Sequence, residues 1–189
     1  MFKNEFVEFC SKVHPAVPLV IYLPFVAVML YVARWLNQLS VLTIVGLFLL
    51  GMLLWTLFEY VVHRFVFHYE PKSRLGKRLH FIIHGVHHDY PNDARRLVMP
   101  PSVSIPVAVV MYFLFAALFG RFAPVLSAGF AFGYVCYDSI HYATHHFSAK
   151  LGVFAWLKRY HLHHHFKDDA RGYGISSPLW DYVFGTARK

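Results

Sequence analysis

The sequence predicts an all-α integral membrane protein with four transmembrane helices, arranged as two hairpins, and a cytoplasmic helical cap that carries a histidine-rich dimetal site. Three observations predict this. The 189 residues are 57% hydrophobic and only 15% charged, which is far more apolar than a soluble domain. Four apolar runs approach the roughly 20 residues that cross a bilayer. The histidines gather at the ends of these runs. A chain of this length is expected to form a single domain, 1–189.

The four apolar runs are expected to form the membrane helices. The first run is longer than the apolar core of a signal peptide, and no small-residue cleavage site follows it, so we expect a retained helix. No internal repeat separates the runs. Their approximate bounds are 17–36, 41–62, 103–120 and 123–143.

The positive residues predict the orientation of these helices. Residues 1–16 hold two Lys, residues 62–100 hold seven Lys or Arg, and residues 147–189 hold seven more, which together make 16 of the 18. The two remaining cations, Arg34 and Arg121, lie in the other turns. Because Lys and Arg accumulate on the cytoplasmic side, both termini, the long middle segment and the metal site are expected there.

The charge balance also bears on partners. Lys and Arg outnumber Asp and Glu by 18 to 10, which in a soluble protein suggests nucleic-acid binding. In a chain with these apolar runs, anionic lipid head groups are the expected partner, and no nucleic acid is expected. Cys10 and Cys136 form neither a disulfide framework nor a CxxC pair.

Thirteen of the 14 histidines lie from residue 63 onward, at or beyond the predicted cytoplasmic ends of the apolar runs. The exception, His14, is expected to be an interfacial loop residue. The others form four clusters, in the stretches HRFVFH (63–68), HFIIHGVHH (80–88), HYATHH (141–146) and HLHHH (161–165). Their gathering at one predicted membrane face favours metal binding over ordinary packing.

Helical spacing separates the histidines of the last cluster. With about 100° between successive residues of an α-helix, His164 lies about 60° to one side of His161 and His165 about 40° to the other. His163 falls about 200° away, on the opposite face. The stretch therefore reads as His-x-x-His-His with one bystander.

The other clusters strengthen this interpretation. His141 and His145 are four residues apart and share a helix face, a spacing able to grip one metal. The His-x-x-His-His pattern occurs a second time, at 84–88. Neutral imidazole binds Fe, Zn, Cu and Ni, and a structural zinc needs only four ligands. About ten ordered histidines therefore favour a two-metal catalytic site over one structural ion.

The stretches EYVVHRFVFH, LHFIIHGVHHDYPNDARRLVMPP, GYVCYDSIHYATHH and GYGISSPLWDYVFGT together carry a resemblance to a known family. They resemble the fatty acid hydroxylase and sterol desaturase superfamily of histidine-rich membrane di-iron oxygenases, and within it the fatty acid 2-hydroxylases. The resemblance covers residues 55–187, the expected catalytic region, whereas residues 1–54 match only as generic membrane helices.

The resemblance implies the metal ligands position by position. His80 is uncertain, because its helical position permits a ligand or an outer role that the family pattern does not require. His146 and His163 are extra to the pattern and are expected not to bind metal. The implied ligands are His63, His68, His84, His87, His88, His141, His145, His161, His164 and His165.

Three acidic residues are expected to orient ligand rings from the outer shell. Asp138 precedes His141 by three residues and Glu59 precedes His63 by four, spacings that share a helix face. A carboxylate that accepts the distal ring proton would fix an imidazole; ordinary ion pairing with an Arg is the alternative. Asp181, in the family-like tail, would bind a ligand histidine or cap local structure.

The resemblance implies a mixed-function oxygenase that hydroxylates a lipid acyl chain at the carbon next to the carboxyl group, in a free fatty acid or a sphingolipid. The implied cofactors are two iron ions, with dioxygen as co-substrate, and zinc is able to occupy such sites in purified protein. A fused haem domain is not expected, so electrons would come from a separate electron-transfer protein. The basic cytoplasmic face would bind that protein or anionic lipids. Its residues include Lys72, Arg74, Lys77, Arg78, Lys158 and Arg159.

Other functions stay open on the sequence alone. A carotenoid or sterol hydroxylase, or a desaturase, of the same superfamily shares the chemistry, and product analysis separates these. A membrane zinc hydrolase would consume no oxygen. A third class is a metal transporter or a non-catalytic metal-binding membrane protein. Transport sites are expected near the bilayer midplane, whereas these histidines lie at helix ends.

Overall fold

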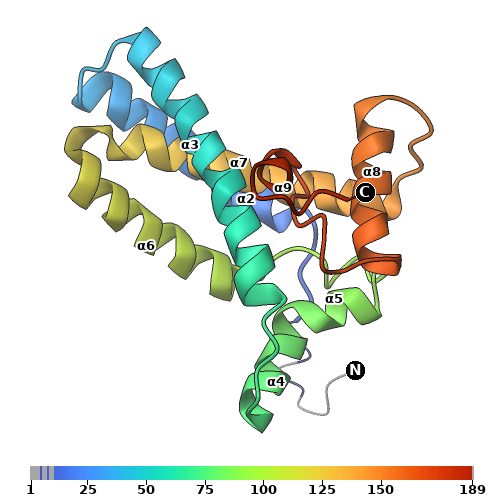
Figure 1. Ribbon diagram of the computed structural model, residues 1–189. Helices are drawn as coiled ribbons and strands as arrows, with labels where there is room; N and C mark the ends of the chain where they lie inside the picture. The colour runs from blue at the N-terminus through green and yellow to red at the C-terminus, as the bar shows by residue number, and fades with distance from the viewer. Residues whose placement is uncertain (1–4, 6–7, 9–10, 189) are drawn as a thin grey trace. The chain divides into compact units, whose positions relative to one another are not determined.

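The computed structural model describes residues 5, 8 and 11–188, and these form helices and connecting turns (Figure 1). The chain divides into two compact units. The apolar unit comprises Ala16–Trp55 and Met99–Asp138, and the histidine unit comprises Met1–Pro15, Thr56–Val98 and Ser139–Lys189. Cys10 lies outside the described residues, and Cys136 is a free, half-buried cysteine.

The apolar unit is built from helices of nearly continuous Leu, Val, Phe and Ala. Such segments satisfy their backbone hydrogen bonds internally, as a membrane requires. Three helices are long and apolar enough to cross a bilayer: Val17–Leu36, Val41–Phe67 and Pro101–His146. The described chain is therefore an all-α membrane protein, while the finer arrangement of four crossings in two hairpins stays a prediction.

The helices of the apolar unit follow the four predicted apolar runs. The first run forms α2 (Val17–Tyr31), continued by the π-helical turn η1 (Val32–Leu36). The second forms α3 (Val41–Val62). The last two form α6 (Pro101–Phe119) and α7 (Ala123–His146), separated by the short 3-10 turn η4 (Gly120–Phe122).

Two glycines allow α3 and α7 to approach closely within the apolar unit. A Cβ atom at Gly51 would lie 2.4 Å from the carbonyl oxygen of Leu126, and one at Gly129 would lie 2.1 Å from that of Phe48. Small residues at helix contacts are typical of membrane proteins, where dispersion rather than the hydrophobic effect holds helices together. These two positions therefore fix where α3 crosses α7.

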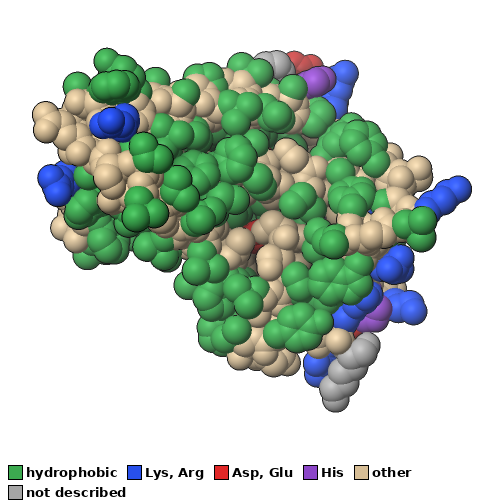
Figure 2. Space-filling model, turned by 90° about the horizontal axis from the view of Figure 1, so that it is seen from above, with side chains coloured by type: hydrophobic (Ala, Val, Ile, Leu, Met, Phe, Trp, Pro, Cys, Tyr) green, Lys and Arg blue, Asp and Glu red, His purple; other side chains and the backbone are tan. Residues whose placement is uncertain are grey.

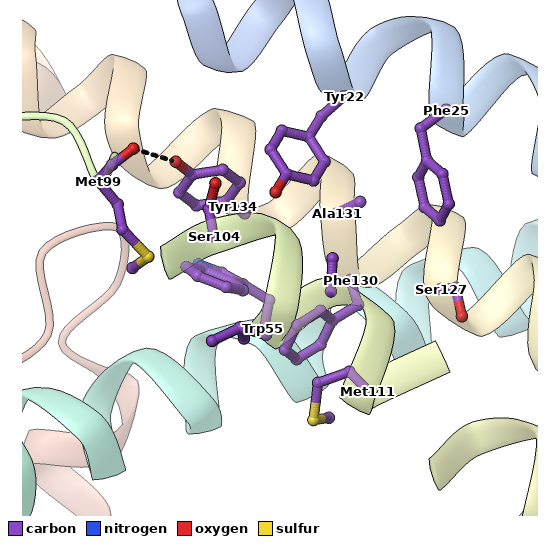
Figure 3. A pocket seen from close by; sticks show the side chains of 12 residues that line it. Tyr22, Phe25, Trp55, Met99, Ser104, Met111, Ser127, Phe130, Ala131 and Tyr134 are labelled. Atoms are coloured by element: carbon purple, nitrogen blue, oxygen red, sulfur yellow. Dashed lines mark hydrogen bonds between the residues drawn. The ribbon is translucent and has the colours of Figure 1, made fainter. Parts of the chain in front are cut away.

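An aromatic cluster and a small cavity lie beside this crossing. The ring of Trp55 packs 5.1 Å from that of Phe130 and 5.2 Å from that of Tyr134. Figure 3 shows Ser104 and Tyr134 beside Met99 in the cavity wall, where the Tyr134 hydroxyl donates to the Met99 carbonyl over 3.4 Å. The apolar unit thus buries a few polar groups within a mostly apolar interior.

The histidine unit is built from shorter helices and turns. The C-terminal ends of α3 and α7 contribute to it. Ser73 is the N-cap of α4, because its hydroxyl accepts from the Gly76 amide over 3.0 Å. Its remaining elements are η2 (His63–Phe67), α4 (Arg74–His80), η3 (Phe81–Gly85), α5 (Val86–Asp89), α8 (Gly152–Phe166) and α9 (Leu179–Val183).

Candidate metal centre

Ten histidines of the histidine unit converge in two groups of five, and within each group the candidate ligand nitrogens all lie within 4.8 Å of one another. Six of the ten are buried and four are half-buried, in keeping with the little histidine visible on the face in Figure 2. Group A consists of His63, His68, His84, His88 and His164. Group B consists of His87, His141, His145, His161 and His165.

A π-helical turn brings the first two histidines together. Residues five apart lie about 140° from each other on an α-helix, so His63 and His68 would diverge. The structure instead closes an i to i+5 hydrogen bond from the His68 amide to the His63 carbonyl over 3.2 Å, the pattern of a π-turn. The two Nε2 atoms consequently lie 3.3 Å apart.

The first His-x-x-His-His repeat contributes to both groups. His84 and His88, four residues apart, enter group A, whereas His87 enters group B. The ring centroids of His84 and His88 lie 4.5 Å apart. One short helical segment, η3 followed by α5, therefore supplies three side chains to two different sites.

The second repeat, on α8, also divides between the two groups, but gives its pair to group B and its single histidine to group A. His161 and His165, again four residues apart, belong to group B, and His164 belongs to group A. His163, the predicted bystander, is in neither group. Each repeat therefore gives a pair to one group and a single histidine to the other, which ties the positions of the two groups together.

The nitrogen contacts of group B fit a bound cation. The Nε2 atom of His161 lies 2.8 Å from that of His145 and 3.0 Å from that of His165, and the Nε2 atoms of His141 and His87 are 2.8 Å apart. A neutral imidazole carries one N–H and one lone pair, so several nitrogens facing one point cannot all satisfy one another. A shared metal ion accepts all of these lone pairs.

The hydrogen bonds of the group A rings also fit a bound metal ion. The Nδ1–H of His63 donates to the Tyr173 carbonyl over 2.6 Å, and that of His164 donates to the Arg171 carbonyl over 2.8 Å. In the neutral rings, both Nε2 atoms therefore bear lone pairs. Both face the Nε2 atom of His68, at 3.3 and 3.0 Å, and this atom is able to donate to only one. The donor set thus fits a metal ion.

Burial keeps these rings in the form that binds metal. Burial, followed by the neighbouring His164 and His88 rings, lowers the pKa of His68 to about 3. Burial and the His164 ring lower the pKa of His88 to about 4. Burial, then His141 and His165, also lowers the pKa of His161 well below its usual range. At neutral pH these rings are therefore uncharged, as metal ligation requires.

The remaining histidines of the clusters lie outside both groups. His80 is close to the site in sequence, but its Nε2 hydrogen-bonds the Phe67 carbonyl, one residue before His68. His146 packs its ring 4.5 Å from that of Tyr142. The structure thus places His80 where it supports the backbone at His68 and assigns His146 to local packing.

Glu59, one of the three acids expected to orient ligand rings, contacts the tail. The tail is defined here as residues Arg171–Thr186. The Glu59 carboxylate accepts from the Ile175 amide over 2.6 Å and from the Ser176 amide over 2.9 Å, and also from the Ser176 hydroxyl. The ring of His63, four residues later, donates to a backbone carbonyl rather than to this carboxylate.

Asp181 has the same kind of role within the tail. Its carboxylate is fully buried and accepts from the amides of Tyr173 and Gly174 over 3.0 and 2.8 Å, and from the Thr186 hydroxyl over 2.8 Å. Asp138, the third of these acids, is buried at 2% exposure and belongs to the apolar unit.

Backbone carbonyls accept the hydrogen bonds from the rings of His63 and His164, and these acceptors were not predicted from the sequence. The carbonyls of Arg171 and Tyr173 hold His164 and His63. A carbonyl is common to every residue, so residue type carries no signal for it. The only available indication was the family-like tail itself, GYGISSPLWDYVFGT.

Comparisons with known proteins agree with this geometry. The model of the fatty acid hydroxylase family matches residues 48–186. A dihydroceramide fatty acyl 2-hydroxylase of Arabidopsis thaliana is 42% identical over 188 residues, which cover 98% of this chain and 78% of the relative. Fatty acid 2-hydroxylase of Rattus norvegicus is 47% identical over 146 residues, covering 75% of this chain and 39% of the relative.

A solved structure is also similar. It is described as full-length scs7p with only the hydroxylase domain visible, and it matches with a TM-score of 0.91 at 41% identity, covering 100% of this chain and 72% of the other. The family model spans both histidine groups, and the similarity to these relatives extends over most of the chain. The chain therefore belongs to the fatty acid hydroxylase family, a family of oxidoreductases.

Proposed function

We propose that this protein hydroxylates a lipid acyl chain at the carbon next to the carboxyl group, using dioxygen and a histidine-held dimetal centre. The observation that carries the proposal is the convergence of ten histidines in two groups of five. Relatives named as dihydroceramide fatty acyl 2-hydroxylases and as a fatty acid 2-hydroxylase support the position of attack. They support a sphingolipid or fatty acid as the substrate class.

In this proposal the two groups are the ligand sets of two iron ions. When bound, the two irons supply the redox chemistry that lets dioxygen and two electrons hydroxylate an unactivated carbon. The protein holds the neutral rings in place, through the repeats that exchange one histidine each and through the carbonyls of Arg171 and Tyr173. Zinc is able to occupy the same rings in purified protein.

Burial is the second contribution of the chain. His63, His84, His161 and His164 are each 8% exposed or less, so water has little access to the metal-binding nitrogens. Excluding water from an oxidising site prevents side reactions. The histidine unit therefore supplies orientation and protection.

We further propose that the chain crosses the bilayer four times, as two hairpins, with the histidine unit as the cytoplasmic cap. The break at η4, where Gly120 has a φ of 53°, supports a chain reversal between α6 and α7. The concentration of Lys and Arg outside the apolar runs supports the orientation. An acyl chain would then reach the histidines from the cytoplasmic leaflet.

The bilayer and a separate electron-transfer protein are the proposed partners. On α4 the exposed apolar residues Leu75 and Leu79 alternate with exposed Arg74, Lys77 and Arg78, a composition typical of contact with anionic lipid surfaces. The overall excess of cations supports an acidic electron donor.

Expression of the chain with an electron donor, followed by mass spectrometry of the lipids, tests the proposal. We expect 2-hydroxy acyl lipids from the wild type and none from His164→Ala, while the matched variant His163→Ala retains activity because His163 lies outside both groups. Supplying labelled fatty acid and labelled ceramide in parallel identifies the substrate. Absence of any 2-hydroxy product from the wild type would overturn the proposed reaction, and equal product from His164→Ala would overturn the proposed site.

A further inference from the structure

The tail carries a further inference, which rests on the proposed dimetal centre. We propose that the tail, Arg171–Thr186, is a positioning element for group A alone, so that the two metal positions differ in how firmly they retain an ion. Asp181 and Glu59 are the positioning residues. Their carboxylates accept hydrogen bonds from backbone amides of the tail, and backbone carbonyls of the tail accept hydrogen bonds from the rings of His63 and His164.

The first step is the fixing of the tail by Asp181. One carboxylate oxygen accepts from the Tyr173 amide and the Thr186 hydroxyl, and the other accepts from the Gly174 amide. The Thr186 amide in turn donates to the Asp181 carbonyl over 2.8 Å. A buried carboxylate is stable only when such donors replace water. The turn therefore depends on both carboxylate oxygens of Asp181 acting as acceptors.

The second step is the anchoring of the tail to α3. Glu59 accepts from the Ile175 and Ser176 amides, and Tyr60 shares a 3.0 Å hydrogen bond with the Thr186 hydroxyl. These contacts lie within one turn of His63 on the same helix. They bring the Tyr173 carbonyl to the ring of His63.

The third step is the local geometry that lets two carbonyls reach two rings. Gly172 separates Arg171 from Tyr173 and has a φ of 76°, a conformation that favours glycine. Its amide donates to the Thr186 carbonyl over 3.0 Å. With the chain turned at Gly172, the carbonyl before it accepts from His164 and the one after it accepts from His63.

Group B has no corresponding support from the tail. The Nδ1 atoms of His161 and His165 are buried and have no hydrogen-bond partner among the described residues. These two rings are held by packing, whereas the two in group A have their tautomer and direction set by carbonyls. Loss of such outer partners typically lowers metal affinity by about 10- to 100-fold. We therefore expect disruption of the tail to empty group A first.

The test measures metal per chain in full-length, purified protein, by elemental mass spectrometry after loading with Zn²⁺ alone. Wild type is expected to hold two ions, one for each group. Asp181→Asn should hold one, because an amide nitrogen would face the backbone N–H groups. Asp169→Asn, an exposed acid near group A, should hold two. This control separates the hydrogen bonds of Asp181 from a simple loss of negative charge.

Double variants identify which histidine group loses its ion. Adding His145→Ala to Asp181→Asn should leave the protein nearly metal-free, whereas adding His68→Ala should change nothing further. Thr186→Val is a milder change that serves if Asp181→Asn does not fold. This variant is expected to release one ion to a chelator faster than the wild type does, and Thr186→Ser is expected to restore the wild-type rate of release.

The outcomes separate this inference from the function on which it rests. Two firmly held ions in Asp181→Asn or Thr186→Val, or loss of both ions together, would overturn the role of the tail and leave the dimetal hydroxylase in place. Failure of the wild type to bind metal would instead overturn the proposed metal centre.

Discussion

The two histidine groups are alike in composition and differ in what surrounds them. Each contains five histidines, drawn from one pair outside the repeats, a four-residue pair of one repeat and a single histidine of the other. In group A, however, the rings of His63 and His164 donate hydrogen bonds to backbone carbonyls of the tail. The difference indicates that equal ligand sets need not be equally held, because ring orientation depends on atoms beyond the ligands.

The two His-x-x-His-His repeats each contribute histidines to both groups. His87 and His164 each lie on a helix that mainly serves the other group. A displacement of either helix therefore moves ligands of both groups. The exchange couples the two positions mechanically, while the tail distinguishes them.

The largest expected effect comes from removing the single histidine that a repeat contributes to the other group. His87→Ala removes one histidine of group B from the segment that carries two histidines of group A. We expect hydroxylation to fall to background, together with loss of at least one ion, because the proposed reaction uses both metal positions. Product analysis and metal content measure this. Activity of His87→Ala within a few-fold of wild type would contradict the shared role of the repeats.

A smaller effect is expected from distorting the tail without substituting any of its polar residues. In Gly174→Ala the new Cβ would lie 2.2 Å from the Ser177 carbonyl oxygen and 3.0 Å from Asp181. Overpacking of this kind costs about 1–3 kcal/mol, and we expect weaker retention of one ion in chelator-release measurements. Gly46→Ala is the matched control, because nothing lies within 4 Å of its added Cβ. Identical release from the two variants would show that the tail tolerates the change.

A substitution in the apolar unit should lower stability while sparing the distinction between the groups. A Cβ at Gly129 would meet the Phe48 carbonyl at 2.1 Å, so Gly129→Ala is expected to reduce stability by about 1–3 kcal/mol. Thermal unfolding in detergent should show the loss, and metal content at low temperature should stay at the wild-type value. Selective loss of one ion would show that the two units are coupled more tightly than this prediction allows.

The smallest effect is expected at the histidines outside both groups. His146→Ala removes a ring that packs on Tyr142, and we expect unchanged metal content and a change in stability below about 1 kcal/mol. His80→Ala removes the hydrogen bond to the Phe67 carbonyl, so a modest loss of activity with both ions retained is expected. Loss of a full ion from either variant would add that residue to the ligand set.

Much of this molecule was predictable from local patterns. The apolar runs predicted the long helices, because length and hydropathy are local properties of a segment. The four-residue spacings predicted that His141 would share a face with His145, and His161 with His165. The off-face position of His163 was also predictable, and the structure places it in neither group.

Other features could not be read from residue types. The five-residue spacing of His63 and His68 has meaning only with the π-turn at η2, and the carbonyls that hold His63 and His164 belong to residues of any type. Glu59 illustrates the limit, since helical spacing directed it to His63 while the folded tail presents amides to it.

The sequence by itself determined which side chains are available and which lie on one face of a helix, since both follow from composition and helical period. The tertiary structure alone decided that each repeat divides between two groups, and that tail carbonyls accept hydrogen bonds from two rings of group A. The physical reason is that these relations join residues as far apart as His63 and Tyr173, and only chain folding fixes the distances between them.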